Sequence, residues 1–161
     1  MGGFKYLYSK RTYQCSTNIC TTLKKNIRRD GPFDGVVGFS QGAALACALC
    51  AMSKEGFSFR FGVIFSGYLP RDASLRKVMD ESLKDQRKGA AVKVFSTAGE
   101  KDLPFCRRAI PELVEAFGTG HVTSVVHPGG HELPVCSRGG EPVLKALQSF
   151  FGDQRKSVPS N

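Results

Sequence analysis

Ser40 is the side chain in this sequence best placed to act as a nucleophile. It lies in the pentapeptide GFSQG (residues 38–42), between an apolar run and an alanine-rich stretch. Where a strand turns sharply into a helix, a G-x-S-x-G motif lifts the serine hydroxyl clear of the backbone. The flanking glycines prevent collisions there, and a serine that only capped the helix would not need them. The helix start also favours developing negative charge, so the motif predicts nucleophilic chemistry at Ser40.

A serine hydroxyl needs a general base, and the base needs an acid to orient it. The chain has three histidines, of which His121 and His127 lie at the two ends of one apolar run. We expect His131 to be the base, because the glycines of the loop HPGGHELP let it swing over a sheet, and His127 to bond locally. For the acid, Asp102 is favoured over Glu100, since a shorter carboxylate can be buried against the imidazole.

The elements that would position these residues alternate between short apolar runs and longer helical patterns. Four runs predict strands: 33–39, 59–66, 91–97 and 122–127. Five stretches predict helices, the first of them weak: 21–29, 41–52, 74–87, 104–117 and 141–151. Nearly continuous Val, Ile and Phe are typical of strands covered on both faces. The pattern predicts an α/β fold, a three-layer α/β/α sandwich with about four mainly parallel strands.

The three candidate residues all follow predicted strands. Ser40 follows the first strand, Asp102 the third and His131 the fourth. Ligands of such sheets bind at the carboxyl ends of the strands, so these side chains are expected at one edge. Their chain order of nucleophile, acid and base is that of α/β-hydrolases.

Four segments, in this order, resemble the FSH family of serine hydrolases: GPFDGVVGFSQGAALA, VIFSGYLPR, GEKD and HPGGHELP. The similarity runs over residues 30–151. It implies a small α/β-hydrolase that acts as an esterase or thioesterase, with Ser40 as nucleophile, Asp102 as acid and His131 as base. It also implies that the backbone N–H of Gln41 donates to the oxyanion. Five residues after the second strand are implied at the substrate rim: Gly67, Tyr68, Leu69, Pro70 and Arg71.

The front of the chain departs from that family. Residues 1–20 show no buried-strand pattern, so the fold is expected to be truncated, without the opening strands and their second oxyanion donor. Loss of one such donor costs about 10²–10³ in turnover. The strand before Ser40 would then lie at or near a sheet edge, unpaired on one side, and favour self-association. The expected organisation is a basic, poorly structured leader at 1–20, a hydrolase domain at 21–152 and a polar tail at 153–161.

Composition argues against several other classes of protein. The formal net charge is +9, but seven lysines and arginines and no acidic residue lie within residues 1–29, so the rest carries only +2. This charge belongs to the leader and does not predict a nucleic-acid-binding face. No apolar stretch is long enough to span a bilayer. The acid-free start also has a weak likeness to an organellar presequence.

The six cysteines predict neither a disulfide framework nor a metal site. Cys47 and Cys50 form a C-x-x-C, but they lie within an Ala/Leu run and no second pair completes a zinc site. Free thiols predict a reducing compartment, which favours the cytoplasm, with the nucleus and organellar import as alternatives.

The favoured function is therefore hydrolysis of small-molecule carboxylic esters or acyl thioesters, a chemistry that needs no metal or cofactor. An acyl-protein thioesterase is one alternative, because such enzymes share the GFSQG elbow, although the PGGH loop fits them poorly. The other is a weakly active or non-catalytic protein that binds an acyl ligand or a partner.

Overall fold

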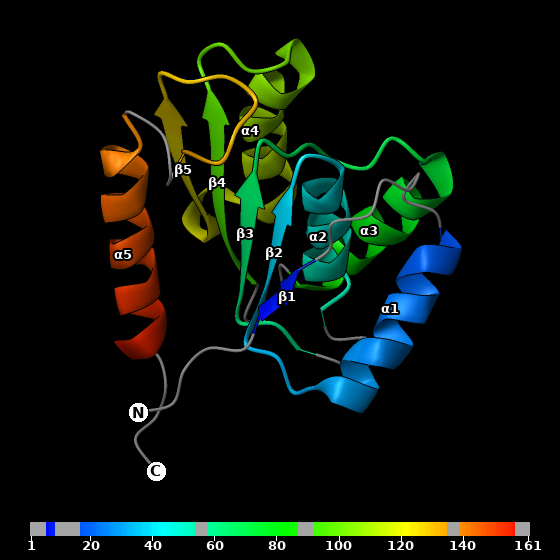
Figure 1. Cartoon of the computed structure of the whole chain (residues 1–161). Coiled ribbons are helices and arrows are strands. Elements are labelled where there is room, and N and C mark those ends of the chain that lie inside the picture. Colours follow the sequence, from blue (N-terminus) through cyan, green and yellow to red (C-terminus); the bar gives the residue numbers. More distant parts are fainter. Residues whose placement is uncertain (1–5, 9–16, 54–57, 87–91, 135–138, 157–161) are drawn as a thin grey trace.

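The computed structural model describes residues 6–8, 17–53, 58–86, 92–134 and 139–156. Its centre is a parallel sheet whose strands follow one another in chain order from β1 to β5 (Figure 1). The five strands in the described residues are β1 (Tyr6–Tyr8), β2 (Gly35–Phe39), β3 (Phe61–Phe65), β4 (Lys93–Gly99) and β5 (Val122–His127). The α-helices are α1 (Thr17–Asp30), α2 (Gln41–Ala51), α3 (Ala73–Gln86), α4 (Pro104–Phe117) and α5 (Glu141–Lys156). A 3₁₀ turn, η1 (Thr119–His121), precedes β5.

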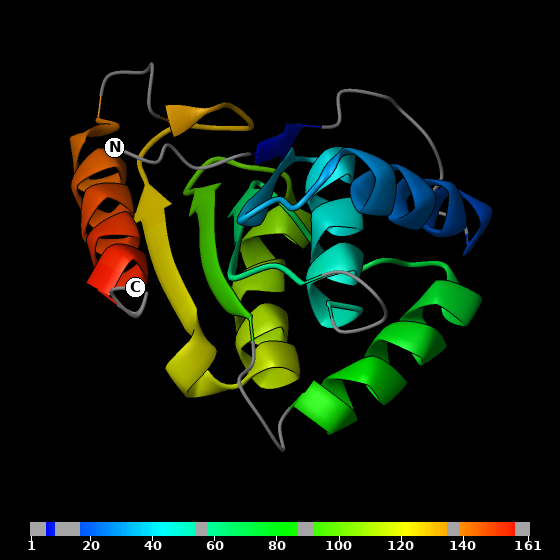
Figure 2. The same ribbon diagram turned by 90° about the horizontal axis from the view of Figure 1, so that it is seen from below.

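Helices cover both faces of the sheet, which gives the three-layer α/β/α sandwich predicted from the sequence. Figures 1 and 2 show α5 on one face and α1 to α4 on the other. Each face has its own apolar cluster. The larger cluster joins α1, α2, α3 and α4 to strand residues such as Ile64, and the smaller joins α5 to Phe61, Val63 and Phe65. This division follows from the strand period of two, which sends alternate side chains of β3 to opposite faces.

Helix α2 is deeply buried. Every residue from Ala43 to Ala51 is buried, and the small side chains of this run let the helix lie close to the sheet. Cys47 and Cys50 belong to this packing and are free thiols, and burial raises the pKa of the Cys47 thiol to about 12. They act here as small apolar residues, as the sequence predicted.

The register of the sheet brings the ends of neighbouring strands together. Phe39 pairs with Phe65, Phe65 with Thr97, and Gly99 with His127. The residues that follow β2, β3, β4 and β5 therefore emerge at the same edge, where the candidate residues were expected.

The predicted leader needs correction. Strand β1 and the first residues of α1 lie within residues 1–20, where the sequence indicated no regular structure. Strand β1 also pairs with β2 from Tyr6↔Gly35 to Tyr8↔Val37, so the strand before Ser40 is not unpaired on that side. Three residues are too few to show a hydrophobic period, and pairing with β2 defines them as a strand.

The first residues of the predicted polar tail are helical, because α5 continues to Lys156. Gln154 is buried, and its carbonyl oxygen accepts a hydrogen bond from the Arg60 guanidinium. This contact with the residue before β3 extends the helix beyond the last large apolar side chain, where the sequence pattern ends. The rest of the predicted tail, residues 157–161, lies outside the described residues.

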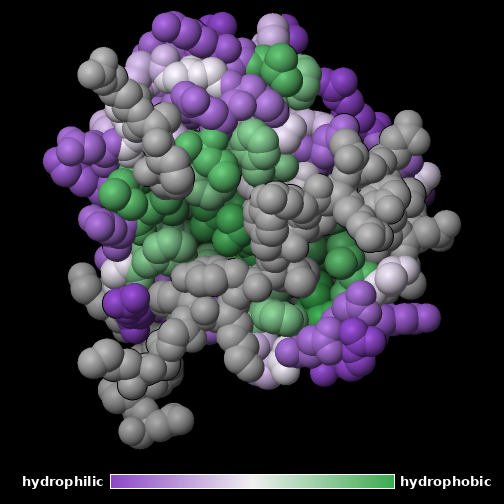
Figure 3. Space-filling model, in the orientation of Figure 1, coloured by the Kyte–Doolittle hydropathy of each residue, from purple (hydrophilic) through white to green (hydrophobic). Residues whose placement is uncertain are grey.

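Apolar surface gathers beside α5 on the face of the molecule seen in Figure 3. The smaller cluster on this side includes half-buried members, among them Val37, Phe39 and Val125. Phe39 directly precedes Ser40, so this apolar surface extends to the edge of the sheet at which the candidate residues lie.

Candidate active site

Ser40 occupies a strained turn between β2 and α2. Its backbone has φ 55° and ψ −120°, in the left-handed region that a non-glycine residue rarely adopts. The turn is held by a hydrogen bond from the Ser40 N–H to the Phe65 carbonyl, 2.9 Å. A Cβ at Gly38 would lie 2.3 Å from the Gly42 carbonyl oxygen, so only glycine fits where the strand passes the helix. These features form the strand–turn–helix context in which a G-x-S-x-G motif exposes its serine hydroxyl.

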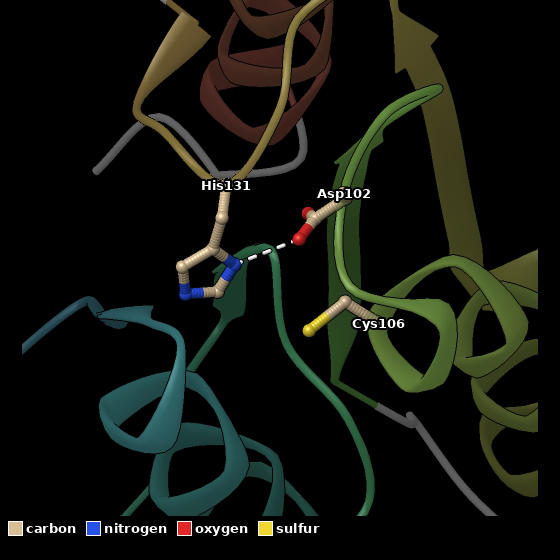
Figure 4. A group of neighbouring side chains, drawn as sticks. All are labelled: Asp102, Cys106 and His131. Carbon is tan, nitrogen blue, oxygen red and sulfur yellow. Dashed lines mark hydrogen bonds and ion pairs between the residues drawn. The ribbon is translucent and has the colours of Figure 1, made fainter.

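The structure brings Ser40, His131 and Asp102 into one line of hydrogen bonds. His131 Nε2 lies 2.9 Å from Ser40 Oγ. His131 Nδ1 lies 2.7 Å from Asp102 Oδ1, and Figure 4 draws this second contact. With the proton on Nδ1 donated to Asp102, Nε2 is free to accept the Ser40 hydroxyl proton. The side chains come from three separate segments, and the spacing is that required of a nucleophile, a base and an orienting acid.

The three groups differ in exposure as their chemistry requires. Asp102 is 4% exposed, whereas the His131 side chain is 30% exposed and Ser40 is partly exposed. The Phe39 ring packs on the imidazole, with centroids 4.9 Å apart, and limits how far it can turn. Asp102 is therefore shielded from water while Ser40 remains accessible to a ligand.

Asp102 is held as a carboxylate. Burial raises the pKa of its carboxyl, but the Ser66 hydroxyl, the His131 ring and the Leu103 N–H lower it by more, so the pKa lies below its ordinary value. The Leu103 N–H donates to Oδ1 at 2.6 Å. A charged carboxylate at this point fixes the imidazole tautomer and would stabilise an imidazolium.

Backbone hydrogen bonds join the loop that carries Asp102 to the loop that carries His131. The Glu100 N–H donates to the His127 carbonyl at 2.7 Å, and the Lys101 N–H donates to the Gly129 carbonyl at 3.0 Å. The His127 side chain bonds locally, as expected, because its Nδ1 accepts the Gly129 N–H at 3.2 Å. Asp102 and His131 are thus positioned by two loops that backbone hydrogen bonds hold together.

Cys106 lies beside the acid and the base. One ligand atom each from Asp102, Cys106 and His131 fall within 4.8 Å of one another (Figure 4), a spacing that could hold a metal ion. Burial, followed by the Asp102 charge, raises the pKa of the Cys106 thiol to about 12, against an opposing effect of Arg71. A metal-binding cysteine must lose this proton, and both His131 nitrogens already face Asp102 and Ser40. The chemistry of these donors therefore fits a proton relay better than a metal site.

The five expected rim residues have different environments. Gly67 is buried, and a Cβ there would lie 2.4 Å from Ile64 and 2.6 Å from Ala43, so it serves packing. Leu69 and Pro70 are buried but line an open cleft together with Arg71. Tyr68 is half-buried, and its ring lies below the exposed Arg71 guanidinium at 5.4 Å.

Sequence reasoning missed Ser66 and Cys106. Ser66 is buried at the end of β3, has φ 47°, and lies close enough to lower the pKa of Asp102. The rule that polar residues at strand ends meet at one edge could have identified it. Cys106 lies one helical turn after Asp102, but a lone cysteine in an amphipathic helix gives no signal of its own.

The parallel sheet, the strained serine turn and the order of the three residues define a protein of the α/β-hydrolase class. The sequence profile of the family described as Serine hydrolase (FSH1) matches residues 4–141. The chain belongs to this family of serine hydrolases.

Relatives and solved structures agree with this assignment. Esterase OVCA2 of Xenopus tropicalis is 31% identical over 133 residues, which are 81% of this chain and 54% of that protein. Rhodanese-like domain-containing protein 6 of Arabidopsis thaliana is 32% identical over 134 residues, 81% of this chain and 22% of that protein. The chain thus spans about half the length of Esterase OVCA2 and about a fifth of the length of Rhodanese-like domain-containing protein 6.

Two solved structures share the fold. The esterase Pf2001 of Pyrococcus furiosus superposes with a TM-score of 0.55 at 20% identity, over 92% of this chain and 64% of that one. Acyl-protein thioesterase 2 of Zea mays superposes with a TM-score of 0.54 at 23% identity, over 80% of this chain and 62% of that one. At these identities the likeness shows the α/β-hydrolase fold.

Proposed function

We propose that this chain is a serine-dependent hydrolase of carboxylic esters or acyl thioesters. The observation that carries the proposal is the line of hydrogen bonds from Ser40 Oγ through His131 to Asp102, with the serine accessible and the acid buried. Membership of the serine hydrolase family supports it.

In the proposed reaction, Ser40 Oγ attacks the acyl carbonyl carbon while its proton passes to His131 Nε2. Asp102 stabilises the imidazolium that forms. The tetrahedral intermediate collapses, and the leaving alcohol or thiol takes the proton from Nε2. Water then loses a proton to Nε2 and attacks the acyl-enzyme, and Ser40 recovers its proton as the carboxylic acid departs.

The negative charge of the tetrahedral intermediate needs hydrogen-bond donors. Gln41 is the first residue of α2, so its N–H has no acceptor within the helix and can donate to the oxyanion. The helix dipole adds a favourable field at this position. A second N–H donor is usual in such a hole, and loss of one donor costs about 10²–10³ in turnover.

Labelling with a fluorophosphonate tests the nucleophile directly. The wild-type chain should be labelled at Ser40 and should hydrolyse p-nitrophenyl acyl esters, whereas Ser40→Ala should do neither. Ser124→Ala, which changes an exposed serine on β5, is the matched control and should keep both properties. Labelling at another serine, or equal hydrolysis by Ser40→Ala, would contradict the proposal.

Whether the Ser40→Ala variant still binds an acyl ligand distinguishes an enzyme from a non-catalytic binder. An enzyme with Ser40→Ala loses turnover, whereas a binder shows no turnover in the wild-type chain and keeps its acyl ligand in the variant.

A fatty-acylated peptide thioester tests the acyl-protein thioesterase alternative. This alternative predicts faster hydrolysis of the peptide thioester than of simple esters.

Partners and compartment follow the same proposal. None of the helices in the described part of the chain is long and apolar enough to cross a membrane. The free thiols of Cys47, Cys50 and Cys106 fit a reducing compartment, which supports the cytoplasm. Self-association through an exposed sheet edge stays a prediction, which light scattering over a range of concentrations tests; among the described strands, β1 is the outer one beside β2.

A further inference from the structure

An open cleft of about 540 Å³ lies between α4 and the segment that joins β3 to α3. We call it the arginine cleft, because Arg71, Arg76 and Arg108 line it together with Phe105 and Glu112. We infer that the arginine cleft binds an anionic group, a carboxylate or a phosphate, on the ester or thioester substrate. This inference rests on the proposed function and names the substrate class for the same site.

Arg71 is held in position by aromatic rings. Its guanidinium carbon lies 4.6 Å from the centre of the Phe105 ring and 5.4 Å from that of Tyr68. The two rings meet edge to face, with centroids 5.1 Å apart at 90°. Stacking of this kind fixes the plane of the guanidinium but leaves its N–H donors free for a planar anion.

The balance of charge in the arginine cleft is positive. Three guanidinium groups face one carboxylate, Glu112, and Arg76 is also paired with Asp80 at 3.0 Å. Within the part of the chain that the structure describes, neither Arg71 nor Arg108 forms an ion pair, and both are exposed. Two cations therefore remain for a ligand.

The starts of two helices also line the cleft, with Ala73 at the start of α3 and Phe105 at that of α4. The Asp72 carboxylate caps α3, because it accepts the Leu75 N–H at 2.8 Å and so offsets the positive end of that helix dipole. The positive charge of the cleft therefore comes from its arginine side chains.

The arginine cleft adjoins the reacting groups. Phe105 is the neighbour of Cys106, whose sulfur lies within 4.8 Å of ligand atoms of Asp102 and His131. The charge of Arg71 is close enough to oppose the rise in the pKa of the Cys106 thiol. A substrate whose carbonyl lies at Ser40 can therefore place an anionic group in the cleft, while buried Leu69 and Pro70 supply an apolar wall.

Paired substrates test the inference and locate the anion. On the acyl side, p-nitrophenyl hemiglutarate is compared with neutral p-nitrophenyl valerate. On the leaving-group side, butyryl-coenzyme A is compared with neutral butyryl-N-acetylcysteamine. In at least one pair we expect the anionic member to have the higher kcat/KM, by about tenfold in low salt, and the preference to shrink as salt is raised. The pair that shows it distinguishes a carboxylate from a phosphate ligand.

Two substitutions connect this preference to the cleft. Arg71→Gln and Arg108→Gln should each lower the ratio of anionic to neutral kcat/KM by about tenfold. Arg107→Gln is the matched control, because it removes an equal charge from the adjacent position of α4 and should leave the ratio unchanged. Equal rates within both pairs, or a ratio that falls equally in the control, would overturn the inference.

Binding to the Ser40→Ala variant separates this inference from the proposed function. Calorimetry should show that one of the anionic substrates binds and that Arg71→Gln, added to this variant, weakens binding about tenfold. If the wild-type chain is not labelled by the fluorophosphonate and these anions still bind, the proposed function fails and the anion site stands. If Ser40 is labelled and neutral esters are hydrolysed without any anion preference or binding, the anion site fails and the function stands.

Discussion

At the scale of single residues, the candidate site depends on groups that support Asp102. The carboxylate accepts hydrogen bonds from His131 and Leu103 and has Ser66 nearby. Among the described residues Ser66 Oγ is buried without a hydrogen-bond partner of its own, and this hydroxyl lowers the pKa of Asp102, so Asp102 is the group on which it acts. Ser66 is therefore a candidate positioning residue, acting through the acid.

Ser66→Ala should lower kcat/KM about tenfold, because the Asp102 carboxylate loses part of its stabilisation. The loss raises the pKa of Asp102, so the fall in kcat/KM that accompanies protonation of this carboxyl should begin at higher pH. Ser66→Gly removes the same hydroxyl but relieves the positive φ, so it should match the activity of Ser66→Ala while being more stable by about 1 kcal/mol. Unchanged pH profiles in both variants would assign Ser66 a purely structural role.

The lowered pKa of Asp102 also predicts how stability depends on pH. A carboxyl whose pKa is lower in the folded state stabilises the fold above its unfolded value of about 3.9, and this contribution is lost as the pH falls through the folded value. Asp102→Asn should therefore destabilise the protein most at neutral pH and progressively less below about pH 4. Urea denaturation of both proteins at pH 7 and pH 3 measures this, and a destabilisation that grew on acidification would be contrary to it.

At the scale of elements, the two loops that carry the acid and the base approach each other at a glycine. A Cβ at Gly99 would lie 2.2 Å from the Gly129 carbonyl oxygen and 2.5 Å from that of Gly130. Any larger residue must push the loops apart and move His131 away from Asp102.

Gly99→Ala should accordingly destabilise the protein by about 1–3 kcal/mol and lower kcat/KM about 10²-fold. Gly120→Ala is its control, because a Cβ there meets nothing within 4 Å, and it should change the free energy of unfolding by less than about 0.5 kcal/mol. Denaturation curves and ester hydrolysis of the two variants give the comparison. Full activity in Gly99→Ala would show that the loops tolerate separation.

The bounds of the helices and strands also show how much of the fold could be predicted from the sequence alone. Helix α4 (Pro104–Phe117) and strand β5 (Val122–His127) have the predicted bounds, because a proline and a glycine delimit the first and polar turns flank the second. The turn at Ser40 was predictable because its motif requires a particular backbone. Strand β1 and the end of α5 were not predictable from local sequence. Strand β1 is defined by its pairing with β2, and the end of α5 contacts Arg60, and both partners lie far away in the sequence. The arginine cleft likewise depends on packing between α4 and the segment after β3.

At the scale of the whole molecule, the two faces of the sheet are covered unequally. Four helices share one face, whereas α5 is the helix that covers the other in the described part of the chain (Figure 2). Phe150 of α5 is 6% exposed, and its ring lies 6.1 Å from that of Phe61 and 5.7 Å from that of Phe95. Phe150 therefore docks α5 on the sheet together with Val143, Leu147 and Phe151.

Phe150→Ala should destabilise the protein by about 3–5 kcal/mol, a large share of the about 5–15 kcal/mol by which a domain is usually stable. Leu144 lies on the same helix but is 44% exposed, so Leu144→Ala should cost less than about 0.5 kcal/mol. Because α5 follows the loop that carries His131, the Phe150 variant should also lose ester hydrolysis on heating before its far-ultraviolet circular dichroism changes. Simultaneous loss of activity and helix signal would instead mean that α5 unfolds only with the rest of the sheet.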